Sequence, residues 1–416
     1  MADASTPADR TVLRAERLVD VVTGEVQSPG VIVVEGEKIV GVGSDAAVDD
    51  AVVIELGDRT LLPGLMDMEL NFFMGGPGDR GARTSVVETP IDRSFRAVVN
   101  ARTTLMAGFT TVRNLGLFIP TGGHLLDVSL ARAIERGYVV GPRIVPAGHA
   151  ITPTGGHLEP TVFVGLAHGI MPLSVEEGVA DGVDEVRRAV RHQIKFGARV
   201  IKVCASGGVM SHTGPPGAQQ YSDEELATVA EEAHRAGLKV AAHAHGDAGI
   251  RAAIEAGIDC IEHGSLMTEE TLALAKARGT FLVATTYLAD GLDVSRAAPD
   301  LQAKAAEVFP RARQTISRAL EMDLKVCCGT DAPAIPHGQN AKELLALVDR
   351  GASPLRALQT ATITAAELVD ADDRGRLEPG LLADVIAVPG HPLEDIGVTE
   401  SVDFVMLGGT VHARPG

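Results

Sequence analysis

The sequence predicts an α/β protein in which a (β/α)8, TIM-like barrel carries a small β-sandwich domain. Two observations support the barrel and one supports the sandwich. Short apolar runs alternate with Ala-rich helical stretches through most of the chain, and eight of these runs are strand-like. Runs typical of β-structure, punctuated by Gly and Asp, stand at both ends. An open doubly wound sheet is the alternative, but no G-x-G-x-x-G follows an early strand.

The two ends of the chain share the same pattern of short strand-like runs. Residues 11–60 contain short apolar or alternating runs, and residues 375–416 return to that pattern. Neither segment makes a convincing domain alone, so we expect them to pair. The predicted organisation is one composite β-sandwich from residues 1–61 and 371–416, beside a catalytic barrel from residues 62–370.

The composition indicates a globular protein with an aliphatic core. Hydrophobic residues make up 45% and charged residues 22%, while aromatic residues are only 3%, so Ala, Val, Leu and Ile must fill the interior. The net charge of −18 argues against nucleic acid and anionic membranes as partners. We therefore expect a small-molecule substrate, no nucleic acid and no membrane, and a homo-oligomeric assembly.

The four cysteines predict no disulfide. Cys204, Cys260, Cys327 and Cys328 form no C-x-x-C pair, and each follows an apolar run, as is typical of buried free thiols in a reducing compartment. The first residues have no apolar core of signal-peptide length, and no segment approaches the ~18 apolar residues of a membrane span. The expected localisation is cytoplasmic.

Polar side chains stand at the ends of four of the expected strands. In a barrel these positions share one face, where active sites lie. A lone His, Lys or Gly-Thr-Asp has an ordinary structural explanation. Four polar strand ends that meet at one face of the barrel are improbable as independent coincidences. Histidines and carboxylates that converge there suit zinc. The residues are Lys202 on strand 4, His243 and His245 on strand 5, Glu262 and His263 on strand 6, and Asp331 after strand 8.

With these motifs the chain resembles the amidohydrolase superfamily, near the imidazolonepropionase-like and Xaa-Pro dipeptidase branch that includes ochratoxin-cleaving amidases. The resemblance covers nearly the whole chain. It implies a hydrolase of a carbon–nitrogen bond in a small amide, acting through metal-activated water. The motifs that carry it include "LLPGLMD", "AGFTTVRNLG", "TPTGGH", "VIKVCASGGV", "VAAHAHG", "GIDCIEHG" and "GTDAP".

The resemblance also implies a ligand set. The family's metal-binding positions match Lys202, His243, His263 and Asp331 of this sequence. In relatives the strand-4 lysine is carboxylated. Burial lowers the pKa of a lysine, and a neutral amine can take up carbon dioxide, so a carbamate on Lys202 is expected. Asp331 matches the residue that handles the proton of the attacking water.

The departure from the family pattern lies on strand 1. Where the family has Asp-x-His-x-His, this chain has Asp67, Glu69 and Asn71, which share one strand face. Two imidazole ligands of the family pattern are thus replaced by side chains that offer only oxygen ligands, the Glu69 carboxylate and the Asn71 amide carbonyl. One outcome is a mononuclear site held by the remaining ligands. A second is two metals with Glu69 as a substitute ligand. The third is loss of metal, with an unmodified Lys202 that pairs with Glu69 or acts as an acid/base.

We expect a mononuclear site holding one divalent metal, with zinc as the expected ion, while a second metal is doubtful. Asp331, Glu69 and Lys202 are the predicted catalytic residues. The alternative function is a lyase, isomerase or cyclase in which these three groups move protons with little or no metal dependence. A non-catalytic binding protein is the third hypothesis.

Five residues are predicted to contact substrate. Tyr221 has a competing structural explanation, because Ser222 and Glu225 beside it form a helix capping box. His245 lies two residues past the strand-5 ligand, so a supporting or solvent role competes with substrate contact. The predicted contacts are His157, Tyr221, His337, His245 and Asn71.

Overall fold

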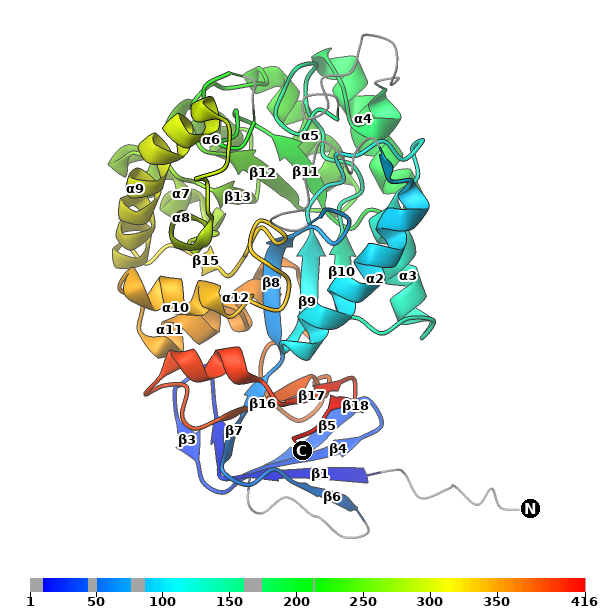
Figure 1. Cartoon of the computed structure of the whole chain (residues 1–416), viewed down its shortest axis with the longest axis vertical. Coiled ribbons are helices and arrows are strands. Elements are labelled where there is room, and N and C mark those ends of the chain that lie inside the picture. Colours follow the sequence, from blue (N-terminus) through cyan, green and yellow to red (C-terminus); the bar gives the residue numbers. More distant parts are fainter. Residues whose placement is uncertain (1–9, 44–50, 76–86, 161–173, 212–213, 416) are drawn as a thin grey trace, which may run out of the picture.

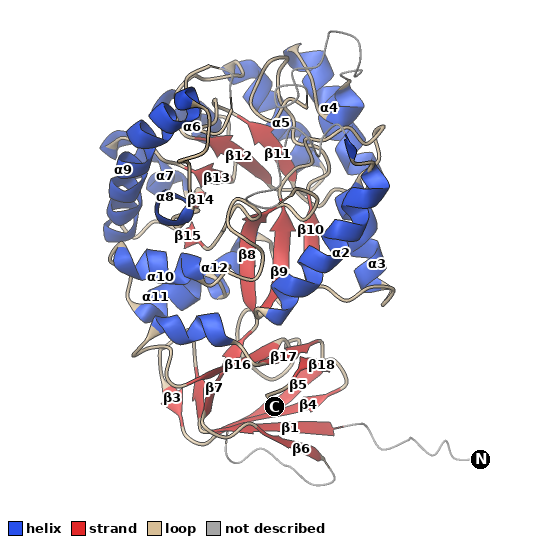
Figure 2. Cartoon of the chain, in the orientation of Figure 1, coloured by secondary structure: helices blue, strands red, loops and turns tan. Residues whose placement is uncertain are grey.

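The computed structural model describes residues 10–43, 51–75, 87–160, 174–211 and 214–415. A ring of strands enclosed by helices lies above a smaller β-rich domain (Figure 1), and the strand and helix colouring separates the two clearly (Figure 2). The predicted fold class, a TIM-like barrel with an accessory β domain, is confirmed.

Eight parallel strands form the barrel. β8, β9 and β10 pair in one run and β11 to β15 in another. Backbone hydrogen bonds close both seams, from Ile151 N to Lys202 O and from Met68 N to Cys328 O. The strands are β8 (Leu65–Leu70), β9 (Phe109–Asn114), β10 (Arg143–Pro146), β11 (Ile201–Cys204), β12 (Val240–Ala244), β13 (Cys260–His263), β14 (Phe281–Val283) and β15 (Val326–Cys327).

Helices cover the outside of this ring. Their ends follow local sequence rules: capping boxes begin α2 and α5, and left-handed glycines end α4 and α7. The helices are α2 (Pro90–Met106), α3 (Leu126–Glu135), α4 (Gly182–Phe196), α5 (Asp223–Arg235), α6 (Asp247–Glu255), α7 (Glu269–Arg278), α8 (Leu288–Gly291), α9 (Pro299–Glu321), α10 (Lys342–Asp349), α11 (Pro354–Thr360) and α12 (Ile363–Leu368), with the 3-10 turns η1 (Val175–Glu177) and η2 (Ile396–Ser401).

The β domain joins the two ends of the chain in one sheet. β16 lies between β7 and β17, so a C-terminal strand pairs with an N-terminal one. This pairing supports our proposal that residues 1–61 and 371–416 form one composite domain. The strands are β1 (Arg10–Ala15), β4 (Gly30–Glu35), β5 (Lys38–Val42) and β6 (Val52–Glu55) in one sheet, and β2 (Arg17–Val19), β3 (Val26–Gln27), β7 (Arg59–Pro63), β16 (Val385–Pro389), β17 (Phe404–Leu407) and β18 (Thr410–Ala413) in the other.

Two further expectations from the sequence concern cysteines and membranes. All four cysteines are buried and free, as predicted. In the part of the chain that the structure describes, no helix is both long and apolar enough to cross a membrane.

Candidate active site

The carboxyl ends of the barrel strands carry unusual backbone conformations. His263 ends β13 with φ of 69°, Thr285 follows β14 with φ of 44°, and Asp331 follows β15 with φ of 52°. Non-glycine residues with such positive φ values are uncommon, and they cluster at sites where the surrounding structure enforces them. This face of the barrel therefore holds side chains in positions that relaxed backbone would not reach.

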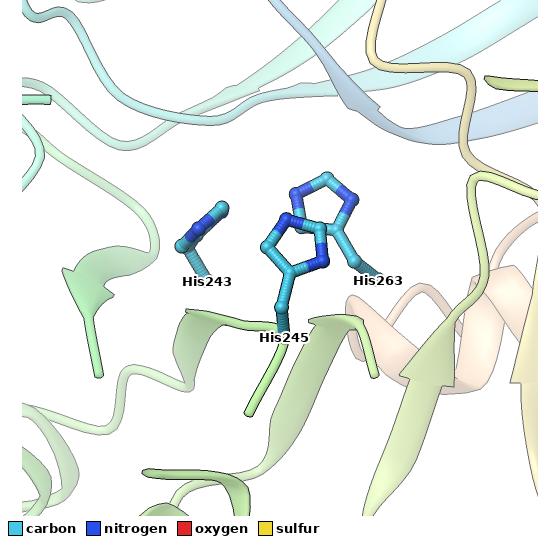
Figure 3. Close-up of side chains that lie close together, drawn as sticks. All are labelled: His243, His245 and His263. Carbon is cyan, nitrogen blue, oxygen red and sulfur yellow. The ribbon is translucent and has the colours of Figure 1, made fainter. Parts of the chain in front are cut away.

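Three histidines meet at this face. His243 comes from β12, His245 follows it directly, and His263 ends β13 (Figure 3). Each offers a ring nitrogen, and these nitrogens lie within 4.8 Å of one another. The Nδ1 atoms of His245 and His263 are 2.8 Å from the hydroxyls of Ser265 and Thr285, which leaves the Nε2 atoms of both rings free of those contacts. Such anchoring orients imidazoles as it does in metal sites.

Burial keeps these imidazoles neutral. It lowers the pKa of His245 to about 3, and it holds the pKa of His243 and of His263 well below the usual value. The neighbouring Lys202 adds to each shift. A neutral imidazole can donate its lone pair to a metal, and the buried Nε2 of His243 has no hydrogen-bond partner among the described residues. The donor set therefore fits a borderline divalent cation such as zinc.

Glu69 and Lys202 form a buried ion pair beside the histidines. Lys202 Nζ lies 3.1 Å from Glu69 Oε1, and His263 Nε2 lies 3.5 Å from the same oxygen. The second oxygen, Oε2, is buried without a hydrogen-bond partner among the described residues. Gly329 makes room for this carboxylate, because a Cβ there would lie 3.1 Å from Glu69 Cβ and 2.2 Å from a Val283 methyl. The strand-1 carboxylate thus faces both a cation and an imidazole.

The pKa of Lys202 departs from the sequence-based expectation. Burial alone would lower it, as predicted, but the carboxylates of Glu69 and Glu262 outweigh burial and raise the pKa above its usual value. Burial in turn raises the pKa of Glu69, against the opposing effect of Lys202. In the unmodified chain the neighbouring carboxylates therefore oppose the neutral amine that burial alone would favour, and a carbamate on Lys202 stays a prediction.

Asp331 is held against strand β8 by its neighbours. Its backbone N–H donates to Glu69 O at 2.7 Å. Asp67 anchors the same turn, since the Thr330 hydroxyl and the Asn340 amide donate to its carboxylate at 2.6 and 2.7 Å. Burial, with smaller contributions from Asp67 and Glu262, raises the pKa of Asp331 to about 7, although Lys202 opposes the shift. The carboxyl is thus poised to exchange a proton near neutral pH.

His157 joins the cluster. Its ring stacks on that of His243, with centroids 4.0 Å apart, and burial lowers its pKa to about 3. Gly208 permits this packing, because a Cβ there would lie 2.3 Å from the His157 ring. The structure thus places this predicted substrate contact against a candidate ligand.

The other predicted substrate contacts are engaged elsewhere. The Tyr221 hydroxyl is buried and donates to Ala180 O at 2.8 Å, in line with its competing structural explanation. The Asn71 amide donates to Gly116 O at 2.9 Å, and its oxygen accepts from Phe73 N at 2.9 Å. Both ends of Asn71 are therefore committed to backbone, which leaves little capacity for a ligand.

His337 contacts Thr104 and Phe72. Its Nδ1 is 3.2 Å from the Thr104 hydroxyl, and its ring lies 5.3 Å from that of Phe72. Its buried Nε2 has no hydrogen-bond partner among the described residues.

Sequence reasoning missed two features of this region. It did not assign Arg113, which is buried in the barrel with its Nη2 2.8 Å from Glu262 Oε1. The charged "VRN" at the end of an apolar strand was the available signal. It also gave His245 a substrate role, whereas the structure groups His245 with His243 and His263.

A small cavity opens beside the histidines. It holds about 30 Å³ and is bordered by His245 and His263 on one side. Its far wall is mostly apolar and comes from α8 and α9, with Leu288, Phe309 and Ile316.

Comparison with known proteins identifies the family. The family model "Amidohydrolase family" matches residues 60–411. Ochratoxinase from Aspergillus niger is 35% identical over 422 residues, covering 94% of this chain and 85% of the relative. A Xaa-Pro dipeptidase crystal structure with methionine in its active site is similar at a TM-score of 0.89 and 36% identity, covering 97% of this chain and 100% of the other. The crystal structure of A. niger ochratoxinase is similar at a TM-score of 0.86 and 33% identity. It covers 99% of this chain and 97% of the other. The chain therefore belongs to the amidohydrolase family and is a hydrolase of carbon–nitrogen bonds.

Proposed function

We propose that the protein is a metal-dependent amidohydrolase that cleaves an amide or peptide-like bond in a small substrate, with one divalent cation, zinc, at the site. The observation that carries this proposal is the meeting of three buried, neutral imidazoles within 4.8 Å. His243 and His263 belong to the ligand set expected from the sequence, and His245 joins them in place of Lys202.

The proposed cation would be held by His243, His245 and His263. Asp331, expected from the sequence as a further ligand, does not belong to this group of donors. When bound, such a cation polarises an amide carbonyl and lowers the pKa of water toward ~7. The carbamate on Lys202 stays a prediction. The ion pair with Glu69 argues for an unmodified ammonium group, since a protonated amine has no lone pair for carbon dioxide.

The carboxyl groups of Asp331 and Glu69 would have different roles, proton transfer for Asp331 and charge for Glu69. The pKa of Asp331 is about 7, so part of it is ionised at neutral pH. The ionised carboxylate accepts a proton from water and returns it to the leaving nitrogen. Glu69 sets the local charge, since its Oε1 lies between Lys202 Nζ and His263 Nε2. The ring of His157, packed on His243, excludes water from that side of the site.

The substrate class follows from the relatives. Because the similar proteins are named for a peptide ending in proline and for ochratoxin, we propose an amide whose acyl or amine part is an amino acid. The small apolar cavity beside His245 and His263 suits a compact side chain on that substrate.

A second candidate function rests on the Lys202–Glu69 pair. Together with Asp331 these groups could run an isomerisation, elimination or cyclisation by proton transfer alone. The 3.1 Å contact between Lys202 and Glu69 favours this alternative, because it engages the carboxylate that replaces a metal-binding histidine of the family pattern.

The test combines metal content with a substrate panel. Protein purified without chelator is expected to hold about one transition metal per chain and to hydrolyse members of a panel of dipeptides, Xaa-Pro peptides and N-acyl amino acids. His245→Ala should lower both metal content and turnover by at least tenfold. The control is His234→Ala, a histidine 43% exposed at the surface, which should change neither.

The alternative predicts a different result. The metal proposal would be overturned if the protein held no metal and catalysed a non-hydrolytic reaction whose rate was unchanged by a chelator. That result would support proton-transfer chemistry. Glu69→His with Asn71→His then separates the two further. A metal hydrolase should gain metal and stay active, whereas a proton-transfer enzyme should gain metal and lose its reaction.

A further inference from the structure

Helix α2 exposes an apolar stripe. Ile91, Phe95 and Val99 are 67%, 70% and 64% exposed and stand four residues apart, so they form one continuous line along the helix. The helix lies on the outside of the barrel beside β9 and α3 (Figure 1). Single exposed apolar residues are normal, but three large ones in register mark an interaction surface.

The opposite face of α2 packs normally. Ala97, Ala101 and Leu105 are fully buried against the barrel. The stripe is therefore not a sign of a misplaced helix, since the helix already buries a core face. It is a second apolar face without a partner among the described residues.

The exposed positions of α2 are symmetric about residue 97. Under a two-fold axis through that point, Phe95 of one chain meets Val99 of another, and Ile91 meets Thr103. Asp92 then meets Arg102, so opposite charges face each other at both ends. In a parallel arrangement each charge would meet its own copy. The exposed residues are Ile91, Asp92, Phe95, Val99, Arg102 and Thr103.

We propose that α2 is a dimer interface, in which two copies of the chain pack their α2 helices antiparallel about a two-fold axis near Ala97. An interface of this kind is self-complementary, as isologous contacts must be. The apolar centre flanked by charges matches the usual core and rim of an interface. We infer that the partner is a second copy of the chain. When two α2 helices run in opposite directions, apolar Phe95 faces apolar Val99, and Asp92 faces Arg102.

The first test is the assembly state. At about 50 µM, well above the micromolar Kd of a weak interface, light scattering should give an even-numbered oligomer for the full chain. Phe95→Glu with Val99→Glu should halve the mass, and its circular dichroism should match the wild type, because Glu is a good helix former. Val52→Glu is the matched control. Val52 is equally exposed, at 64%, but lies in the β domain, so its substitution should leave the mass unchanged.

The second test fixes the register. All four native cysteines are buried, so single exposed cysteines can be introduced without competition. Chains with Phe95→Cys and chains with Val99→Cys, carrying tags of different size, are mixed and oxidised. The antiparallel register predicts the mixed disulfide as the dominant product, since positions 95 and 99 face each other. A monomeric wild type, an undiminished mass after the double substitution, or equal yields of the three crosslinked pairs would each overturn the proposal.

Discussion

The interior of the barrel and the interior of the β domain handle charge in opposite ways. The barrel buries whole ion pairs: the side chains of Arg113 and Glu262 are 1% and 0% exposed, and those of Lys202 and Glu69 are 2% and 6%. The core of the β domain is apolar, with residues such as Leu13, Ile32 and Phe404. Ion pairs such as Arg59–Asp403 lie at its rim, where the two side chains keep 25% and 33% of their surface.

The difference separates a region that only folds from one that does chemistry. A buried ion pair is weak evidence for stability, because desolvation offsets the attraction. We therefore expect the two barrel pairs to serve function, since Glu69 lies beside His263 and Glu262 directly precedes it in β13.

Removing one partner of the deepest pair should be the most damaging change. Arg113→Met leaves the Glu262 carboxylate buried without its cation, and the free energy of unfolding should fall by about 3–5 kcal/mol in urea titrations. Adding Glu262→Leu to this variant should recover much of the loss, because neither charge is then stranded. If the double variant is as unstable as the single one, the loss comes from packing and not from charge.

The Lys202–Glu69 pair should show strong coupling. In a double-mutant cycle with Lys202→Met and Glu69→Gln, the interaction free energy should be about 1–3 kcal/mol in the metal-free protein. The matched control is the Arg10–Glu35 pair of the β domain, 2.8 Å apart but 41% and 36% exposed. Its coupling should stay below about 1 kcal/mol. Equal coupling in the two cycles would remove the contrast between the regions.

Glu343 makes the barrel sensitive to pH. Burial raises the pKa of this carboxyl to about 8, although Thr286 N and Tyr287 N donate to it at 2.7 and 2.8 Å. A folded-state pKa above the unfolded value means that the group stabilises the fold while protonated, and that this stability is lost as pH rises toward 8. Between pH 6.5 and 8, Glu343 should account for a loss of about 1–2 kcal/mol.

The measurement compares two slopes. Glu343→Gln cannot titrate, so between pH 6.5 and 8 the free energy of unfolding of the wild type should fall relative to that of the variant by about 1–2 kcal/mol. The buried histidines are neutral when folded but partly protonated near pH 6.5 when unfolded, so they raise stability across this window; they do so equally in both proteins and cancel in the comparison. Identical slopes would show that the Glu343 carboxyl is already ionised in the folded protein.

The smallest effect is expected at the rim of the β domain. Arg59 donates to both oxygens of Asp403 at 2.7–2.9 Å, but water reaches the pair. Arg59→Met should cost no more than about 1 kcal/mol of unfolding free energy, and less at high salt. A loss as large as that of Arg113→Met would mean that burial does not govern the cost of breaking an ion pair in this protein.

Local patterns in the chain were sufficient to predict the architecture. Alternation of strand-like and helical runs was sufficient for the barrel, because strand and helix periods are local properties of the chain. The position of His243, His263 and Asp331 at strand ends followed from the same pattern. The two-residue period of a strand placed Glu69 on the same face as Asp67, and the change from histidine to glutamate was visible in the letters.

The way these residues act on one another depends on contacts between distant parts of the chain. The pKa of Lys202 is raised because Glu69 and Glu262, distant in sequence, lie beside it, whereas burial alone had predicted the reverse. The grouping of His245 with His263 depends on the positive φ of His263 and on the hydroxyls of Ser265 and Thr285. Charge and orientation at a buried site are set by neighbours from several strands at once, and no local pattern in the chain encodes them.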